Sequence, residues 1–127
     1  MMIKEINSLV LAYLGDTIYE DYIREYLIKK GICNVNELQK EAIKYVSAKA
    51  QCKYVKDLIN KNFFTDYELD IIKKARNHKN NSHPKNCDII TYKYATGFEA
   101  LIGYLKLENN TVRIREIIKE ILREDVC

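Results

Sequence analysis

Two carboxylates interrupt segments that are otherwise almost entirely apolar. The segment LVLAYLGD ends at Asp16, and the segment ATGFEALIGYL contains Glu99. Carboxylates are rarely buried unless they are paired or bound to a metal, because removing the charge from water is costly. Segments that are apolar on almost every side are expected to be buried helices. Each is therefore expected to carry one buried acid with a pairing or a chemical role.

Glycine accompanies each acid, since Gly15 precedes Asp16 while Gly97 and Gly103 flank Glu99. A glycine inside a helix costs about 1 kcal/mol relative to alanine, so it normally serves close packing or function. Close approach of two helices at these positions would bring the two carboxylates together. A divalent cation is the simplest relief of their mutual repulsion.

Other roles for these acids remain open from the residues alone. Glu20 lies one helical turn after Asp16, so it is a candidate third cation ligand or an orienting group. Asp16 could instead form a salt bridge with Arg76 or a lysine, and Glu99 could accept hydrogen bonds from tyrosine hydroxyls. Buried structural ion pairs also use acids of this kind.

The elements that must position the acids are predicted to be helices. Apolar periodicity and stop signals predict helices over residues 6–29, 37–60 with a bend near Ser47, 88–107 and 112–122. A capping-box pattern, TDYE, opens a further helix at Thr65. Four glycines and one proline leave few breakers for a fold with many β-turns. We expect one all-α domain of five to seven helices over residues 1–127.

Composition excludes several classes of protein. The 127 residues are 47% hydrophobic and 31% charged, as in ordinary globular domains, and no apolar run approaches the roughly 20 residues of a membrane span. The first residues lack the apolar stretch of a signal peptide. The four cysteines stand singly, without a CxxC pair. A cytoplasmic protein with free cysteines and no membrane partner is therefore expected, although the count does not exclude disulfides.

The net charge of +3 is unevenly distributed. Residues 73–93 hold six basic side chains and one acidic side chain, a local charge of +5, so the rest of the chain carries −2. Such a block can bind a polyanion or can simply form a solvated loop. A second basic run over residues 40–61 has six lysines against two acids, and it is either an extension of this block or a solvated helix face.

Both acidic segments resemble a known family. Residues 11–19, LAYLGDTIY, resemble the signature helix of the ribonuclease III endonuclease domain, and residues 97–105, GFEALIGYL, resemble its second acidic motif. The segments YVSAKAQ (45–51), RN (76–77) and PKN (84–86) also resemble the short subgroup, Mini-ribonuclease III, which lacks a double-stranded-RNA-binding domain. The resemblance covers nearly the entire chain.

The resemblance implies an all-α homodimer that hydrolyses double-stranded RNA with Mg²⁺, for which Mn²⁺ can substitute. For the subgroup it implies maturation of the ends of the large-subunit (23S) ribosomal RNA precursor. Asp16 and Glu99 match the family's catalytic, metal-binding acids. Without an accessory domain, the duplex must be held by the catalytic domain itself. The candidate RNA-binding residues are Lys73, Lys74, Arg76, Asn77, Lys79, Lys85 and Asn86.

Two positions depart from full-length ribonuclease III enzymes. Those enzymes have a glutamate four residues before this aspartate, where Ala12 stands here, and an aspartate three residues before this glutamate, where Thr96 stands. Mini-ribonuclease III proteins share this reduction, which leaves the number of metals open. The competing interpretation is a non-catalytic helical module that binds double-stranded RNA or another protein.

Overall fold

The structure is a computed structural model that describes residues 2–79, Lys85 and residues 87–126, with side chains described as far as Arg123. Six α-helices and one short 3-10 helix, Ile3–Glu5, make up this described part of the chain. The α-helices are α1 (Ser8–Lys29), α2 (Val35–Val46), α3 (Ala48–Asn60), α4 (Asp66–Arg76), α5 (Ile89–Leu107) and α6 (Thr111–Val126). The predicted all-α fold is confirmed.

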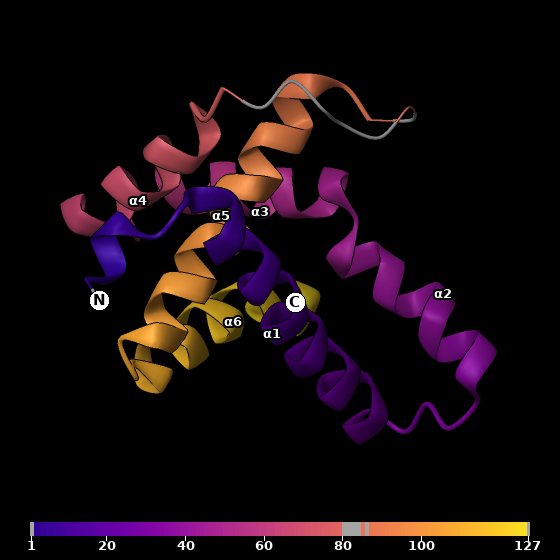
Figure 1. The fold of residues 1–127 in the computed structure, drawn as a ribbon. Coiled ribbons are helices and arrows are strands. Elements are labelled where there is room, and N and C mark those ends of the chain that lie inside the picture. The colour runs from indigo at the N-terminus through magenta and orange to yellow at the C-terminus, as the bar shows by residue number, and fades with distance from the viewer. Residues whose placement is uncertain (1, 80–84, 86, 127) are drawn as a thin grey trace.

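Helices α1 and α5 form the centre of the structure and pack against each other more extensively than any other described pair (Figure 1). Helices α3, α4 and α6 also pack on α5, whereas α2 packs on α1 and extends away from the other helices. Asn7 caps α1 by accepting a hydrogen bond from the Leu9 amide, and Asp88 caps α5 by accepting one from the Thr91 amide. The sequence therefore fixes where both central helices begin.

Glycine sets the separation of the two central helices. A Cβ atom added to Gly15 would overlap the carbonyl group of Glu99 and would lie 2.9 Å from the backbone nitrogen of Gly103. A Cβ atom at Gly103 would in turn overlap the carbonyl group of Leu11. The two backbones therefore touch directly, as the glycine pattern predicts, and this contact brings the segments that carry Asp16 and Glu99 together.

The main hydrophobic core surrounds this crossing. Tyr19 of α1 packs edge-on against Phe98 of α5 with ring centroids 5.0 Å apart, and its hydroxyl donates to the Tyr45 carbonyl oxygen at 2.9 Å. The other large, fully buried apolar side chains come from α1, α3, α4, α5 and α6: Ile23, Leu27, Val55, Ile72, Leu101, Ile102, Leu105, Ile114 and Ile117. No helix among the described residues is long and apolar enough to cross a bilayer.

The predicted helix over residues 37–60 is two helices instead of one bent helix. Ser47 has extended dihedral angles, φ −62° and ψ 154°, and its side chain accepts a hydrogen bond from the Ala50 amide at 3.2 Å. A serine that caps a new helix in this way ends the preceding one. Asn34 likewise caps α2, so that this helix begins at Val35, slightly before the predicted start at residue 37. The chain therefore turns sharply at Ser47, and α3 packs on α5 while α2 does not.

A partly buried ion pair ties α6 to the start of α4. Arg113 donates from Nε and Nη2 to both carboxylate oxygens of Glu68, at 2.7 and 2.8 Å, and from Nη2 to the Phe63 carbonyl oxygen at 2.9 Å. Burial opposes ionisation of Glu68, but hydrogen bonds from Arg113 and the Thr65 backbone outweigh it, so the pKa of Glu68 lies below its ordinary value. The ionised pair therefore stabilises the fold.

Glu68→Gln is expected to lower the free energy of unfolding by about 3 kcal/mol at pH 7, because it leaves the partly buried Arg113 with only its longer ion pair to the exposed Glu116. Since the pKa of Glu68 is lowered in the folded protein, its contribution is present above the ordinary glutamate pKa and is lost as the pH falls through the folded value. Urea unfolding at pH 7 and at acidic pH tests this. Glu25→Gln, which breaks the exposed pair of Glu25 with Lys29, is the control and should leave the free energy of unfolding almost unchanged. Equal losses in the two variants would contradict the assigned role.

Candidate active site

The crossing of α1 and α5 places Asp16 and Glu99 side by side. Their carboxylates are in hydrogen-bonding contact, although they lie 83 residues apart in the chain. Glu99 is half-buried, whereas the side chain of Asp16 is exposed. The prediction that both acids are buried is therefore wrong for Asp16. Gly15 occupies the face of α1 that touches α5, and the next residue turns by about 100° toward solvent.

The environment of Glu99 favours its neutral form. Burial raises the pKa of Glu99 to about 9, and the hydrogen bond with Asp16 and its negative charge act in the same direction. A hydrogen bond from Gln51 opposes the shift. Without a cation, Glu99 is therefore protonated at neutral pH and hydrogen-bonded to Asp16. Two acids in this state form a site at which a cation can replace the proton.

Glutamine 51 contacts this pair from a third helix. Its Nε2 atom donates to Glu99 Oε2 at 3.3 Å and to the Val46 carbonyl oxygen at 2.9 Å. Sequence reasoning assigned it no role beyond the resemblance of its segment. Its position offered a signal, because Gln51 shares the helical spacing of the buried Val55 and Leu58, so that one amide interrupts the buried stripe of α3.

Glu20 lies outside the carboxylate pair. Its side chain forms an exposed ion pair with Arg24 at 3.2 Å. Among the described residues, no three His, Cys, Asp or Glu side chains gather into a set of potential metal ligands. The structure therefore brings Asp16 and Glu99 together and leaves the third candidate on the neighbouring surface of α1.

The two positions where an acid is lacking are occupied by packed side chains. Ala12 is buried in a small cluster with Leu11, Ala75, Ala100 and Tyr104. The buried Thr96 donates its hydroxyl proton to the Tyr92 carbonyl oxygen at 2.9 Å within its own helix. Neither side chain adds a charge to the pair, so any cation there would take its remaining ligands from water and substrate.

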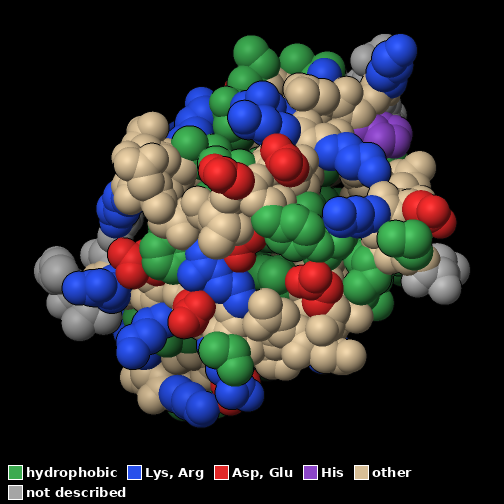
Figure 2. All heavy atoms as spheres, turned by 90° about the vertical axis from the view of Figure 1, so that its left-hand side faces the viewer, with side chains coloured by type: hydrophobic (Ala, Val, Ile, Leu, Met, Phe, Trp, Pro, Cys, Tyr) green, Lys and Arg blue, Asp and Glu red, His purple; other side chains and the backbone are tan. Residues whose placement is uncertain are grey.

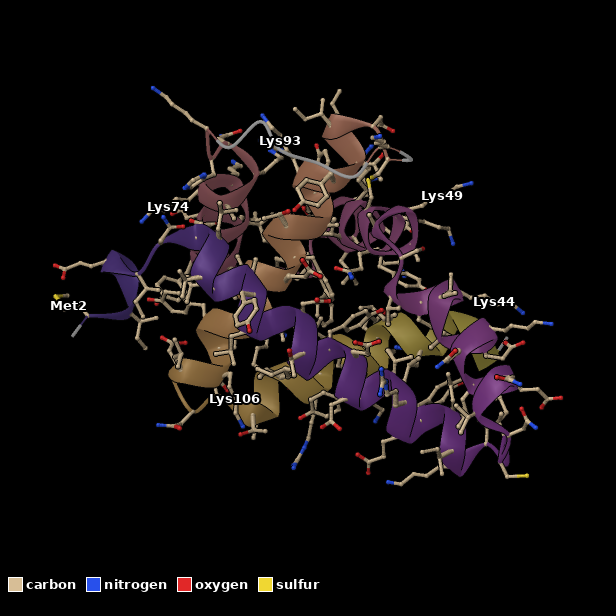
Figure 3. All side chains as sticks on the ribbon, turned by 45° about the vertical axis from the view of Figure 1, so that its right-hand side comes forward. Met2, Lys44, Lys49, Lys74, Lys93 and Lys106 are labelled. Carbon is tan, nitrogen blue, oxygen red and sulfur yellow. The ribbon has the colours of Figure 1, made fainter. Side chains whose placement is uncertain are left out.

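The predicted RNA-binding residues fall into three groups. Lys73, Asn77, Lys79 and Lys85 are exposed and have space for a ligand. Lys74 donates to the Lys4 carbonyl oxygen at 3.0 Å, so it anchors the N-terminal segment. Figure 3 shows it beside that segment, with Lys93 near the start of α5 and Lys106 at its far end. Asn86 lies outside the described residues.

Arg76 belongs to a small cationic cluster on three helices. Its Nη1 donates to the Tyr94 hydroxyl at 3.1 Å, and its guanidinium lies 5.2 Å from the centre of that ring. Lys56 of α3 approaches the same ring at 4.8 Å. Tyr94 therefore holds two positive charges close together, one from each of the two basic runs. The sequence offered residues 40–61 as a possible extension of the basic block at 73–93, but it did not indicate that Tyr94 joins them. The space-filling view in Figure 2 shows basic side chains over much of its face, from the upper edge to the lower edge, with acidic side chains interspersed among them across the middle.

Comparison with known proteins agrees with the resemblance of the two acidic segments. The family description "Ribonuclease III domain" matches residues 9–110. The chain is 42% identical to Mini-ribonuclease 3 of Streptococcus pneumoniae over 113 residues, which cover 89% of this chain and 88% of that protein. It is 47% identical to Mini-ribonuclease 3 of Brevibacillus brevis over 114 residues, covering 90% and 84% of the two chains.

A solved structure also shares the fold. The crystal structure of a protein from Fusobacterium nucleatum matches with a TM-score of 0.85 and 34% sequence identity, and the match covers 97% of each chain. The helices that carry Asp16 and Glu99 both lie almost wholly within residues 9–110, the part of the chain that matches the family. From these matches, the chain belongs to the ribonuclease III family of endoribonucleases, within the group of Mini-ribonuclease 3 proteins.

Proposed function

We propose that the chain cleaves double-stranded RNA at the Asp16–Glu99 pair in a reaction that requires Mg²⁺, with Mn²⁺ able to substitute. The observation that carries this proposal is the contact of two carboxyl groups, one of them half-buried, at the crossing of α1 and α5. Like charges in such contact favour a divalent cation, and Mg²⁺ can bind through one or two carboxylates while keeping several waters. When bound, the ion polarises the scissile phosphate and activates water.

Each residue of the site has a definite part in this proposal. Glu99, held on the rigid central helix α5, supplies the inner ligand, and it must give up its proton when the cation binds. Asp16, exposed on α1, supplies the ligand that faces the substrate. Glu20 remains paired with Arg24 and contributes only to the local potential. We infer that the natural substrate is the 23S ribosomal RNA precursor, as the family resemblance implies.

Duplex RNA would contact the exposed basic side chains near the end of α4 and the cationic cluster beside it. A-form RNA is bound through phosphates and 2′-hydroxyls, for which lysine, arginine and asparagine side chains are suited. We assign phosphate contacts to Lys73, Arg76, Lys79 and Lys85, with Lys56 as an addition and Asn77 as a partner for sugar hydroxyls. We remove Lys74 from this set because its ammonium group already binds the Lys4 carbonyl oxygen.

The double variant Lys73→Ala, Lys79→Ala is expected to bind duplex RNA more weakly and with a smaller dependence on salt. Each phosphate contact contributes a slope of about −0.9 to the plot of log affinity against log salt concentration, so the slope should shrink by about two. Fluorescence anisotropy in EDTA at several salt concentrations measures it. Lys106→Ala removes an exposed lysine at the far end of α5 and should leave the slope unchanged. An unchanged slope in the double variant would contradict the interface.

One face of α1 exposes large apolar side chains. Tyr13 is 82% exposed and Val10 is 57% exposed on the same face of α1, directly before Asp16. Large apolar side chains exposed together favour a protein–protein contact. We propose that this face joins two copies in a homodimer, which sedimentation equilibrium of the full chain tests.

We further propose that the chain is one catalytic domain that works in the cytoplasm, where ribosomal RNA is processed.

A further inference from the structure

The side chain of Gln51 is more deeply buried than the carboxylates of Asp16 and Glu99. This side chain is 1% exposed, and Gln51 is the fourth residue of α3, close to the corner where α2 ends. Its Nε2 atom donates two hydrogen bonds, one to the Val46 carbonyl oxygen and one to Glu99 Oε2. The amide therefore links the corner between α2 and α3 to the carboxylate pair.

The orientation of this amide is determined by its surroundings. The Val46 carbonyl oxygen, at the C-terminal end of α2, can only accept a hydrogen bond, so the NH₂ side of Gln51 must face it. Carbonyl groups in the last turn of a helix lack partners within that helix, and Gln51 satisfies this one. A flipped amide would place two carbonyl oxygens against each other. The oxygen Oε1 must therefore point the other way.

Oε1 is the unusual atom of the site. It is buried and has no hydrogen-bond partner among the described residues. Leaving such an acceptor unpaired costs on the order of 1–3 kcal/mol, and native proteins rarely tolerate it without a function or an ordered partner. Oε1 and Nε2 belong to one planar amide, and Nε2 donates to Glu99 Oε2 at 3.3 Å, so only the width of the amide group and one hydrogen bond separate Oε1 from that carboxylate. A donor near Glu99 would satisfy it.

We propose that Gln51 is a positioning residue of the cation site, in which Nε2 holds the Glu99 carboxylate and Oε1 accepts a hydrogen bond from a water on the bound ion. This inference rests on the proposed function. A hydrated Mg²⁺ is a source of such donors, because the ion keeps several of its waters when only two carboxylates bind it. Groups that orient ligands in this way typically change metal affinity by about 10- to 100-fold when replaced.

A purely structural role explains less of the arrangement. One proton of Nε2 on the Val46 carbonyl oxygen would suffice to cap α2, and an unpaired Oε1 would then be a net cost. The second proton is directed at Glu99, the residue that the proposal makes the inner ligand. A cation bound at the carboxylate pair would explain two features of Gln51 that otherwise have no explanation, namely the contact with Glu99 and the free acceptor.

The test measures Mn²⁺ binding to the full chain without RNA, by the electron paramagnetic resonance signal of free Mn²⁺. Gln51→Met keeps the volume and removes both polar atoms, so we expect at least a tenfold higher Kd for Mn²⁺. Gln51→Asn is too short to reach both partners and should behave alike. Gln39→Met, the same substitution at an exposed glutamine of α2, is the matched control and should bind as the wild type does.

Steady-state cleavage supplies a second measure, since Gln51 is buried and touches no RNA. In saturating metal, kcat should fall while KM for the duplex stays within about twofold. Mn²⁺ affinity of Gln51→Met within twofold of wild type would overturn the proposal, as would loss of the fold in both Gln51 variants. Glu99→Gln distinguishes an error in this inference from an error in the proposed function. If the wild type binds no Mn²⁺, or if Glu99→Gln binds Mn²⁺ as tightly as the wild type does, then the proposed cation site itself is wrong.

Discussion

Asp16→Asn is expected to reduce kcat for cleavage of a long RNA duplex by a factor on the order of 10³ or more, with no loss of thermal stability. A ligand that holds a catalytic ion or stabilises developing charge commonly contributes effects of that size. Asp16 is exposed and makes no core contact, so an amide of the same shape fits its place. Removing its charge also removes one cause of the raised pKa of Glu99. The measurement is single-turnover cleavage, with the melting temperature followed in parallel.

Asp21→Asn provides the matched control for this variant. Asp21 is an exposed aspartate on the same helix, and its substitution has the same chemistry and the same change in net charge. Its rate is expected to stay within about twofold of wild type. Similar losses in the two variants would mean that the charge of α1 as a whole matters and that the carboxylate of Asp16 has no specific role.

Gly15→Ala is expected to be the most damaging single methyl group that can be added to this protein. In an ordinary helix the change from glycine to alanine gains about 1 kcal/mol. Here the new Cβ atom would overlap the Glu99 carbonyl group, which is backbone and cannot rotate away. Forced separation of α1 and α5 should cost about 3 kcal/mol, or a fall of roughly 10 °C in melting temperature. It would also move Asp16 away from Glu99.

A graded series makes this expectation specific. Gly103→Ala meets the Leu11 carbonyl group in the same crossing and should be nearly as harmful. Gly97→Ala meets the Ile72 carbonyl oxygen at 2.9 Å and the Ile72 Cγ2 atom at 3.0 Å, which is a less severe overlap than at Gly15 or Gly103, so its effect should be smaller. Differential scanning fluorimetry ranks the three variants, and activity should fall in the same order. A Gly15→Ala protein as stable as the wild type would contradict the close crossing of the helices.

Much of the fold could be predicted because its determinants are local. Capping at Asp88 and Thr65 and the glycine after Lys30 set helix ends that the structure reproduces within a few residues. The glycine pattern around the two acids also predicted the crossing of α1 and α5. The sequence predicts only a bend at Ser47, because a serine within a helical pattern can either remain inside one helix or cap a new one. The choice depends on how α3 packs, which is a tertiary property.

The site was less predictable for the same physical reason. Apolar neighbours in sequence suggested that Asp16 is buried, yet the rotation of the helix after Gly15 places it in solvent. Lys74 looked like its basic neighbours, but the fold brings the Lys4 carbonyl oxygen to its ammonium group. Gln51 and Tyr94 gain their roles from residues that are 48 and 18 positions away. Contacts of that range leave little trace in local patterns.

The central claim is that the Asp16–Glu99 pair makes this chain a metal-dependent nuclease for double-stranded RNA. The most direct test removes divalent ions from the wild-type protein with EDTA, adds a long RNA duplex, and then titrates Mg²⁺. The account predicts no cleavage in EDTA, saturable cleavage as Mg²⁺ is added, recovery with Mn²⁺, and no cleavage of the separated single strands. Cleavage that persists in EDTA would contradict it, and so would a duplex that is bound but remains intact at every Mg²⁺ concentration, the result expected of a non-catalytic binding module.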